Sequence, residues 1–221
     1  MVNKVKEQSL QREGFFGKRK VLCCQVRYPL LEKGDAPGGE GWISAFYARE
    51  ARESLEKLCR KWYSLACRAS RRLGEDFSPV EVRREYTVIY QGEDFFSAFL
   101  DTFVFRGERE LDRSRVSHTF SLSEGRYVPL SALFRPGFPY RQTILHQVEQ
   151  MVSRQSQRQP EEYYVDWPRL LSPRFSPENF YLASEGLVVY YPRRALGPSV
   201  LGLPSFLLPY PLFGSGLIPE L

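Results

Sequence analysis

Two carboxylates have the type and setting that acid–base chemistry requires. Asp101 interrupts an otherwise apolar segment and Glu85 lies in the segment before it, so a hydrolytic site would use these two residues first. Because a buried carboxylate must be paired, the favoured interpretation of Asp101 is structural, beside an arginine or at the end of a neighbouring strand. The sequence contains no Gly-x-Ser-x-Gly elbow, phosphate-binding loop or dinucleotide fingerprint. We therefore predict a protein that is not an enzyme and has no cofactor.

The two histidines do not indicate a metal site. His118 falls on the apolar side of a predicted strand, where a half-buried, hydrogen-bonded histidine is more common than a catalytic one. His146 falls off the apolar stripe of a predicted helix, so we expect it in solvent. Neither histidine has a Glu or Cys at ligand spacing, and we predict no bound metal.

The four cysteines are expected to be free thiols. Cys23 and Cys24 are adjacent, and neither cysteine pair has the spacing of a zinc site. Cys59 and Cys67 are eight residues apart within a helical pattern. This spacing places them about 12 Å apart along the helix axis, which is too far for a disulfide.

Aromatic residues supply the candidate binding surface, because Tyr and Trp anchor both protein and glycan ligands. Some lie in a long connection and others end a predicted hairpin, with two arginines beside it that favour an anionic partner. The candidate residues are Tyr163, Tyr164, Trp167, Tyr190, Tyr191, Arg193 and Arg194. The alternative is that these aromatic residues close the open face of the sheet. A protein or a cell-wall glycan is the expected partner.

The charge distribution does not favour nucleic acid. The net charge is +5, and the excess lies in residues 1–80, which hold 16 basic residues against 10 acidic ones. Most of these charges share one helix face with glutamates, and no nucleic-acid-binding motif is present. No apolar run is long enough for a membrane helix, and the N-terminus lacks the apolar stretch of a signal peptide. As written, the chain is expected in the cytoplasm.

The elements that must position these residues predict an α+β fold. Residues 43–73 repeat apolar side chains at helical spacing, with Phe46, Leu55, Leu58, Trp62 and Leu65 expected in the core. The patterns predict strands at 20–28, 80–90, 95–105, 115–122 and near Phe206, a second helix after Pro139, and a hairpin at 180–191. Residues 1–18 are expected to be flexible and residues 153–177 a polar connection. The prediction is one domain over 19–221, an antiparallel sheet with one long helix and a second shorter helix packed on it.

Residues 80–213 contain motifs in an order that resembles one bacterial domain family. The motifs are HTFSLSEGRYVPLSALF, FSPENFYLASEGLVVYYPRRALGPSVLG and LPSFLLPY. They resemble the RsiV-like domain of unknown function, which is the extracytoplasmic domain of the anti-sigma factor RsiV and also accompanies the peptidoglycan deacetylase PdaC. Residues 19–75 fit the segment that precedes this domain.

The resemblance implies a non-enzymatic ligand-binding or sensory module, linked to cell-envelope or lysozyme sensing. Family members are usually extracytoplasmic, and in RsiV-like proteins the domain is a receptor for lysozyme. Two departures weaken the transfer of that partner. Residues 107–114 lack the family's Gly-Gly-Ala-His stretch, and Pro192-Arg193-Arg194 replaces its alanine-rich hairpin end. The alternative hypothesis is a carbohydrate-active or hydrolytic accessory protein that uses Asp101 and Glu85.

Overall fold

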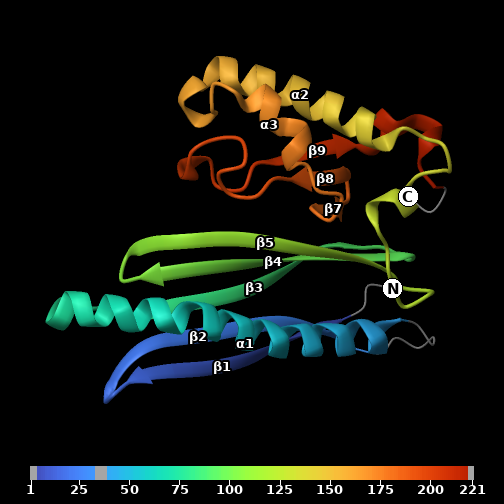
Figure 1. The fold of residues 1–221 in the computed structure, drawn as a ribbon. Coiled ribbons are helices and arrows are strands. Elements are labelled where there is room, and N and C mark those ends of the chain that lie inside the picture. Colours follow the sequence, from blue (N-terminus) through green and yellow to red (C-terminus); the bar gives the residue numbers. More distant parts are fainter. Residues whose placement is uncertain (1–3, 33–38, 219–221) are drawn as a thin grey trace. The chain divides into compact units, whose positions relative to one another are not determined.

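The computed structural model describes residues 4–32 and 39–218 (Figure 1). Contacts divide the chain into two compact units. Unit 1 comprises Met1–Thr87, Leu100–Arg113 and Leu122–Arg126, and unit 2 comprises Val88–Phe99, Ser114–Ser121 and Tyr127–Leu221. The division falls within strands β3 (Val80–Gln91), β4 (Phe95–Arg106) and β5 (Arg109–Ser121), each of which contributes residues to both units.

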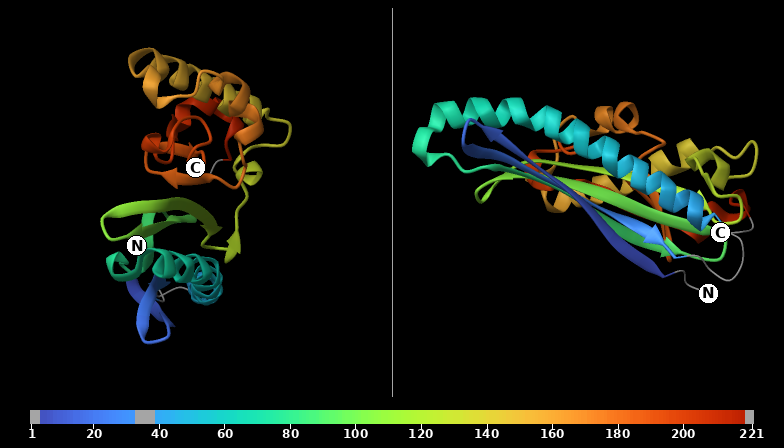
Figure 2. Two further views of the ribbon diagram at one scale, coloured as in Figure 1. Left: turned by 60° about the vertical axis from the view of Figure 1, so that its left-hand side comes forward. Right: turned by 90° about the horizontal axis from the view of Figure 1, so that it is seen from below.

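Unit 1 begins with a hairpin followed by a helical crossover. Strands β1 (Val5–Phe16) and β2 (Arg19–Leu31) pair antiparallel, and helix α1 (Glu40–Leu73) then leads to strand β3 (Val80–Gln91), which pairs parallel to β2. A parallel pair needs a long connection between its strands, and α1 provides it. Figure 2 shows α1 lying along one face of β1 and β2.

The first sheet is mixed and has six strands. Its order is β1-β2-β3-β4-β5-β6, with β4 at Phe95–Arg106, β5 at Arg109–Ser121 and β6 at Arg126–Tyr127. Strand β4 therefore lies between β3 and β5. Short turns join β3 to β4 and β4 to β5, which makes those connections hairpins. The α+β class is confirmed. The sheet differs from the expected antiparallel sheet in one pairing, because β2 and β3 pair parallel.

Residues 1–18 were expected to be flexible, and this is wrong for Val5–Phe16, which form strand β1. Most side chains of β1 are exposed, so the strand has no apolar alternation that a pattern could reveal. Backbone pairing to β2 along the full length of β1 holds it in place. Pro29 does not end β2, because it lies opposite Glu7 within this pairing. The glycine-rich segment 32–41, for which the sequence predicts a loop, lies mostly outside the described residues.

Helix α1 buries a stripe at four- and three-residue steps, as its periodicity predicts. The buried apolar residues are Ile43, Tyr47, Ala51, Leu55, Trp62 and Ala66. The helix ends at Gly74, whose backbone has φ of 55°, a conformation that glycine adopts without steric cost. None of the helices in the described residues has a stretch long and apolar enough to cross a lipid bilayer.

Unit 2 has its own three-stranded antiparallel sheet. Strands β7 (Phe180–Ala183), β8 (Gly186–Tyr190) and β9 (Ser205–Pro209) pair in that order, which confirms the hairpin and the edge strand near Phe206. Helices α2 (Tyr140–Arg158) and α3 (Trp167–Arg174) belong to the same unit. The connection expected at 153–177 therefore contains the end of α2 and all of α3.

The second helix packs in the core of this second sheet. Ile144, Val148 and Val152 of α2 share one buried cluster with Phe180 and Leu187. Short 3-10 helices complete the chain, at Gly74–Asp76, Leu130–Leu133, Pro160–Glu162, Ser199–Leu201 and Tyr210–Gly216.

Buried hydroxyl groups line the free edge of β7 within unit 2. The backbone N–H of Leu182 donates to Ser97 Oγ over 3.0 Å, and Ser97 Oγ lies 2.9 Å from Thr119 Oγ1. Ser117 Oγ donates to the carbonyl of Phe180 over 2.5 Å. Ser117 and Thr119 alternate with apolar residues along their strand, starting from Val116. The structure buries both and leaves Val116 exposed, because an edge strand needs hydrogen-bond partners.

Candidate functional site

Unit 1 contains a pocket between the second half of α1 and the ends of β3, β4 and β5. Its volume is about 570 Å³, within the range of small-molecule sites. We call it the arginine pocket, and its lining residues are Trp62, Leu65, Arg68, Ala69, Arg72, Val80, Arg106 and Leu111.

Apolar side chains form the floor of the arginine pocket. Trp62, Leu65 and Ala69 follow one another at helical spacing on α1, and Val80 and Leu111 come from β3 and β5. Trp62 and Val80 are buried, whereas Leu65 keeps 40% of its surface exposed. Leu65 was expected in the core, and this is wrong, because a side chain with this exposure lies at the surface. Phe46 and Leu58, also expected in the core, are half-buried.

Three arginines contribute positive charge to the same pocket. Arg68 and Arg72 are four residues apart on α1, about 6 Å along the helix axis, and Arg106 is the last residue of β4. Within residues 4–32 and 39–218, no carboxylate forms an ion pair with any of the three. A guanidinium presents a planar fork of N–H donors that matches carboxylate and phosphate oxygens. The pocket is therefore suited to an anion.

One acidic residue next to the pocket lining is already engaged in an ion pair. Asp112 follows Leu111, and its Oδ2 lies 3.4 Å from Lys61 Nζ. Lys61 Nζ also lies 5.0 Å from the ring centroid of Trp62, a cation–π geometry. The lining itself contains no Asp, Glu, His, Cys or Ser, so it offers no nucleophile and no group that exchanges protons near neutral pH.

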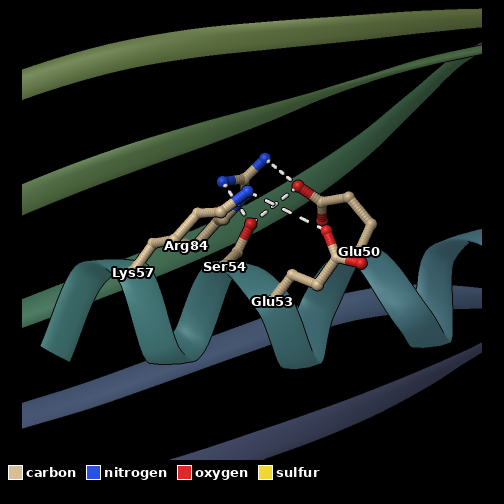
Figure 3. A network of polar contacts seen from close by, with 5 residues as sticks. All are labelled: Glu50, Glu53, Ser54, Lys57 and Arg84. Carbon is tan, nitrogen blue, oxygen red and sulfur yellow. Dashed lines mark hydrogen bonds and ion pairs between the residues drawn. The ribbon is translucent and has the colours of Figure 1, made fainter. Parts of the chain in front are cut away.

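A buried polar network joins α1 to β3 in the same unit (Figure 3). Arg84 Nη2 donates to Glu50 Oε1 over 2.5 Å, Arg84 Nη1 donates to Ser54 Oγ over 2.9 Å, and Ser54 Oγ donates to Glu50 Oε1 over 2.8 Å. Burial lowers the pKa of the Arg84 guanidinium, and the Glu50 charge opposes that shift. Arg84 lies on the same side of β3 as Val80, so the network helps to position the strand that carries part of the pocket floor.

The aromatic residues proposed as a binding surface lie mainly inside unit 2. Tyr163, Tyr190 and Tyr191 are buried, so the expectation that they are exposed is wrong. Tyr164 and Trp167 are half-buried. The long connection and the hairpin do converge, because Tyr163, Trp167 and Tyr191 belong to one hydrophobic cluster. They converge in the core, as the alternative interpretation expected.

Hydrogen bonds explain how these tyrosines are accommodated in the core. The Tyr163 hydroxyl donates to Gln155 Oε1 over 2.5 Å, and the Tyr191 hydroxyl donates to the carbonyl of Leu171 over 3.1 Å. Tyr190 belongs to a different cluster from Tyr191, with Tyr181, since neighbouring residues of a strand face opposite sides.

Three arginines of unit 2, Arg115, Arg193 and Arg194, differ in their environment. The Arg115 guanidinium lies 3.6 Å from the ring centroid of Phe99 and 5.7 Å from those of Tyr181 and Tyr190. Arg193 is half-buried, and Arg194 is exposed with φ of 65°. Their expected role toward an anionic partner stays a prediction.

The other titratable candidates come from four elements: Glu85 from β3, Asp101 from β4, His118 from β5 and His146 from α2. Asp101 is half-buried and has an interaction partner, and Glu85 is half-buried on β3. His118 is half-buried against the rings of Phe120 and Tyr127, and His146 is exposed, as expected. Within the described residues, no three Asp, Glu, His or Cys residues are placed to hold a metal ion. All four cysteines are free thiols.

Residues 131–211 match one family model, described as "Protein of unknown function (DUF3298)". The expected resemblance to a domain of unknown function is confirmed at this level for residues 131–211. No curated protein matches the chain. The arginine pocket lies outside the matched residues.

Solved structures of the same family share the fold. A DUF3298 family member from Bacteroides fragilis is similar with a TM-score of 0.62 and 15% identity, over 99% of this chain and 96% of that one. A DUF3298 family protein from Pseudomonas aeruginosa is similar with a TM-score of 0.60 and 14% identity, over 99% and 95% of the two chains. At these identities the likeness concerns the fold alone.

Reasoning from the sequence missed the arginine pocket, although one signal was available. Leu65 is the apolar residue of the α1 stripe that Arg68 and Arg72 follow at three and seven residues, so all three lie toward one side of the helix. Arg106 lines the pocket because of the order of the strands in the sheet, and a local sequence pattern does not predict that order.

Proposed function

We propose that this protein is a non-enzymatic binding module that takes an anionic ligand in the arginine pocket. The observation that carries the proposal is the set of three arginines without carboxylate partners in the described chain, which line one pocket together with an exposed leucine. Removing an anion from water is favourable only where donors replace its hydration, and the three arginines offer such donors. The absence of a proton-exchanging group among the lining residues supports binding over turnover.

The finer proposal is a sensory module of RsiV-like type. It is supported by the match of residues 131–211 to a family of unknown function and by the order of motifs in residues 80–213. The resemblance adds an expected link to cell-envelope or lysozyme sensing. For the location, the resemblance favours the outside of the cytoplasm, whereas the sequence as written favours the cytoplasm. A cell-wall polymer with phosphate or carboxylate groups would be compatible with the charge of the pocket.

Calorimetric titration of the full chain with phenyl phosphate, and with phenol as the neutral analogue, tests the binding proposal. We expect phenyl phosphate alone to bind, and the Arg68→Gln/Arg72→Gln variant to weaken binding at least about tenfold, as loss of a charge-assisted bond worth about 1.4 kcal/mol requires. The matched control is Arg52→Gln, an exposed arginine of α1 outside the pocket. Binding that survives in the double variant would place the anion elsewhere.

The enzymatic alternative has its own assay. Hydrolysis of nitrophenyl glycosides by the full chain, lost in both Asp101→Asn and Glu85→Gln, would establish a carbohydrate-active protein and overturn the non-enzymatic proposal. We expect no hydrolysis.

A further inference from the structure

The lining of the arginine pocket has a positively charged part and an apolar part. The guanidinium groups of Arg68, Arg72 and Arg106 suit a phosphate or carboxylate, whereas Trp62 and Leu65 of the same lining suit a hydrocarbon. A ligand that is only an anion would leave the leucine in water. A ligand that is only apolar would bring no charge to the arginines. We infer that the pocket binds an amphipathic anion, with one phosphate or carboxylate head and one short apolar chain.

This inference rests on the proposed anion-binding function and adds the apolar half of the ligand. Leu65 carries the additional step, because it belongs to a stripe whose neighbours Trp62 and Ala66 are buried while it remains 40% exposed. A hydrocarbon chain that covers Leu65 completes the apolar stripe of α1. Each methylene that leaves water improves affinity by about fourfold, from the transfer free energy of a buried methylene.

The dimensions of the pocket favour one chain over a larger partner. A volume of about 570 Å³ matches a small ligand, and it is shared among residues of one helix and three strands. A nucleic acid would use the arginines and not the leucine, because its phosphates bring no hydrocarbon. The head group can belong to a free amphiphile or to a lipid in a bilayer, and both present the same chemistry.

A series of ethyl, butyl and hexyl phosphate, titrated into the full chain by calorimetry, tests the inference. We expect affinity to rise by about fourfold for each added methylene until the pocket is filled, and hexanoate to bind in the same site. Arg72→Gln should weaken the whole series by a common factor. Leu65→Ser should flatten the dependence of affinity on chain length. The matched control is Leu207→Ser, a leucine of β9 with nearly the same exposure, 39%.

The outcomes separate the inference from the function on which it rests. Equal affinity across the series, still lost in Arg72→Gln, would overturn the amphipathic ligand and retain an anion site. Equal binding of hexanol and hexyl phosphate would overturn the anion site itself, as would the failure of every phosphate to bind. Co-sedimentation with vesicles of phosphatidic acid in phosphatidylcholine, dependent on Arg72, would identify a lipid head group as the source. Binding of monomeric hexyl phosphate without co-sedimentation would identify a free amphiphile.

Discussion

Arg84 Nη2 lies 2.5 Å from Glu50 Oε1, and this contact joins strand β3 to helix α1 inside unit 1. The two side chains retain only 9% and 19% of their exposure. Removing one partner of such a pair leaves the other charge buried and uncompensated. We expect Glu50→Ala to lower the free energy of unfolding by about 3–5 kcal/mol, measured by denaturant unfolding of the full chain.

The same helix supplies the control for this ion pair. Glu53 and Lys57 are four residues apart, 3.8 Å from oxygen to nitrogen, and largely exposed (Figure 3). Glu53→Ala should cost less than about 1 kcal/mol. The double variant Glu50→Leu/Arg84→Met, which removes both charges, should recover most of the stability lost in Glu50→Ala. Equal losses for Glu50→Ala and Glu53→Ala would contradict the structural role of the buried pair.

Two leucines of α1 should differ in their importance for stability. Leu55 is buried against the sheet and Leu65 is exposed in the arginine pocket. Leu55→Ala should cost about 2–5 kcal/mol through the cavity it leaves. Leu65→Ala should cost less than about 1 kcal/mol, as surface substitutions do. Thermal or denaturant unfolding of both variants checks this difference, and a large loss at Leu65 would show that the pocket floor belongs to the core.

Leu65 also shows what a sequence pattern can and cannot predict. Helical periodicity predicted α1 at residues 43–73, and the structure has it at Glu40–Leu73. Periodicity identifies the apolar face of a helix, but it does not predict which turns of that face other elements cover. Arg84 shows the same limit on β3, because it lies on the same strand face as Val80 and Val82. The partner that makes its burial possible, Glu50, is 34 residues away in the sequence.

The remaining differences have a similar physical origin. Strand β1 has few buried side chains and is held by backbone pairing, and backbone groups carry no sequence signal. Ser117 and Thr119 are buried because their hydroxyl groups meet β7 and Ser97, a contact between distant segments. The candidate aromatic surface was misjudged because large tyrosines suit a core as well as a binding surface when their hydroxyl groups find acceptors.

The hydroxyl contacts along β7 give a prediction for unit 2. Ser97 Oγ accepts from the backbone N–H of Leu182 and contacts Thr119 Oγ1. Ser97→Ala should lower the free energy of unfolding by about 1–3 kcal/mol, because buried polar groups lose a partner. Ser114→Ala, at an exposed serine of β5, should have little effect. Hydrogen exchange at the Leu182 amide should accelerate in Ser97→Ala and not in Ser114→Ala. An unchanged exchange rate in Ser97→Ala would show that this hydrogen bond does not stabilise the edge of β7.

The buried tyrosines predict a loss of stability in alkaline solution. Burial raises the pKa of Tyr47, with the Glu50 charge adding to the shift, and burial also raises the pKa values of Tyr191 and Tyr210. In the unfolded chain these hydroxyls ionise near pH 10, whereas the folded chain keeps its protons to higher pH. The folded state then binds more protons, so the free energy of unfolding falls as pH rises above about 10, by about 1.4 kcal/mol per pH unit for each such tyrosine. Denaturant unfolding between neutral pH and pH about 11, together with tyrosinate absorbance, measures the effect. Tyr191→Phe should reduce the slope by one proton, and an unchanged slope in that variant would mean that Tyr191 ionises alike in both states.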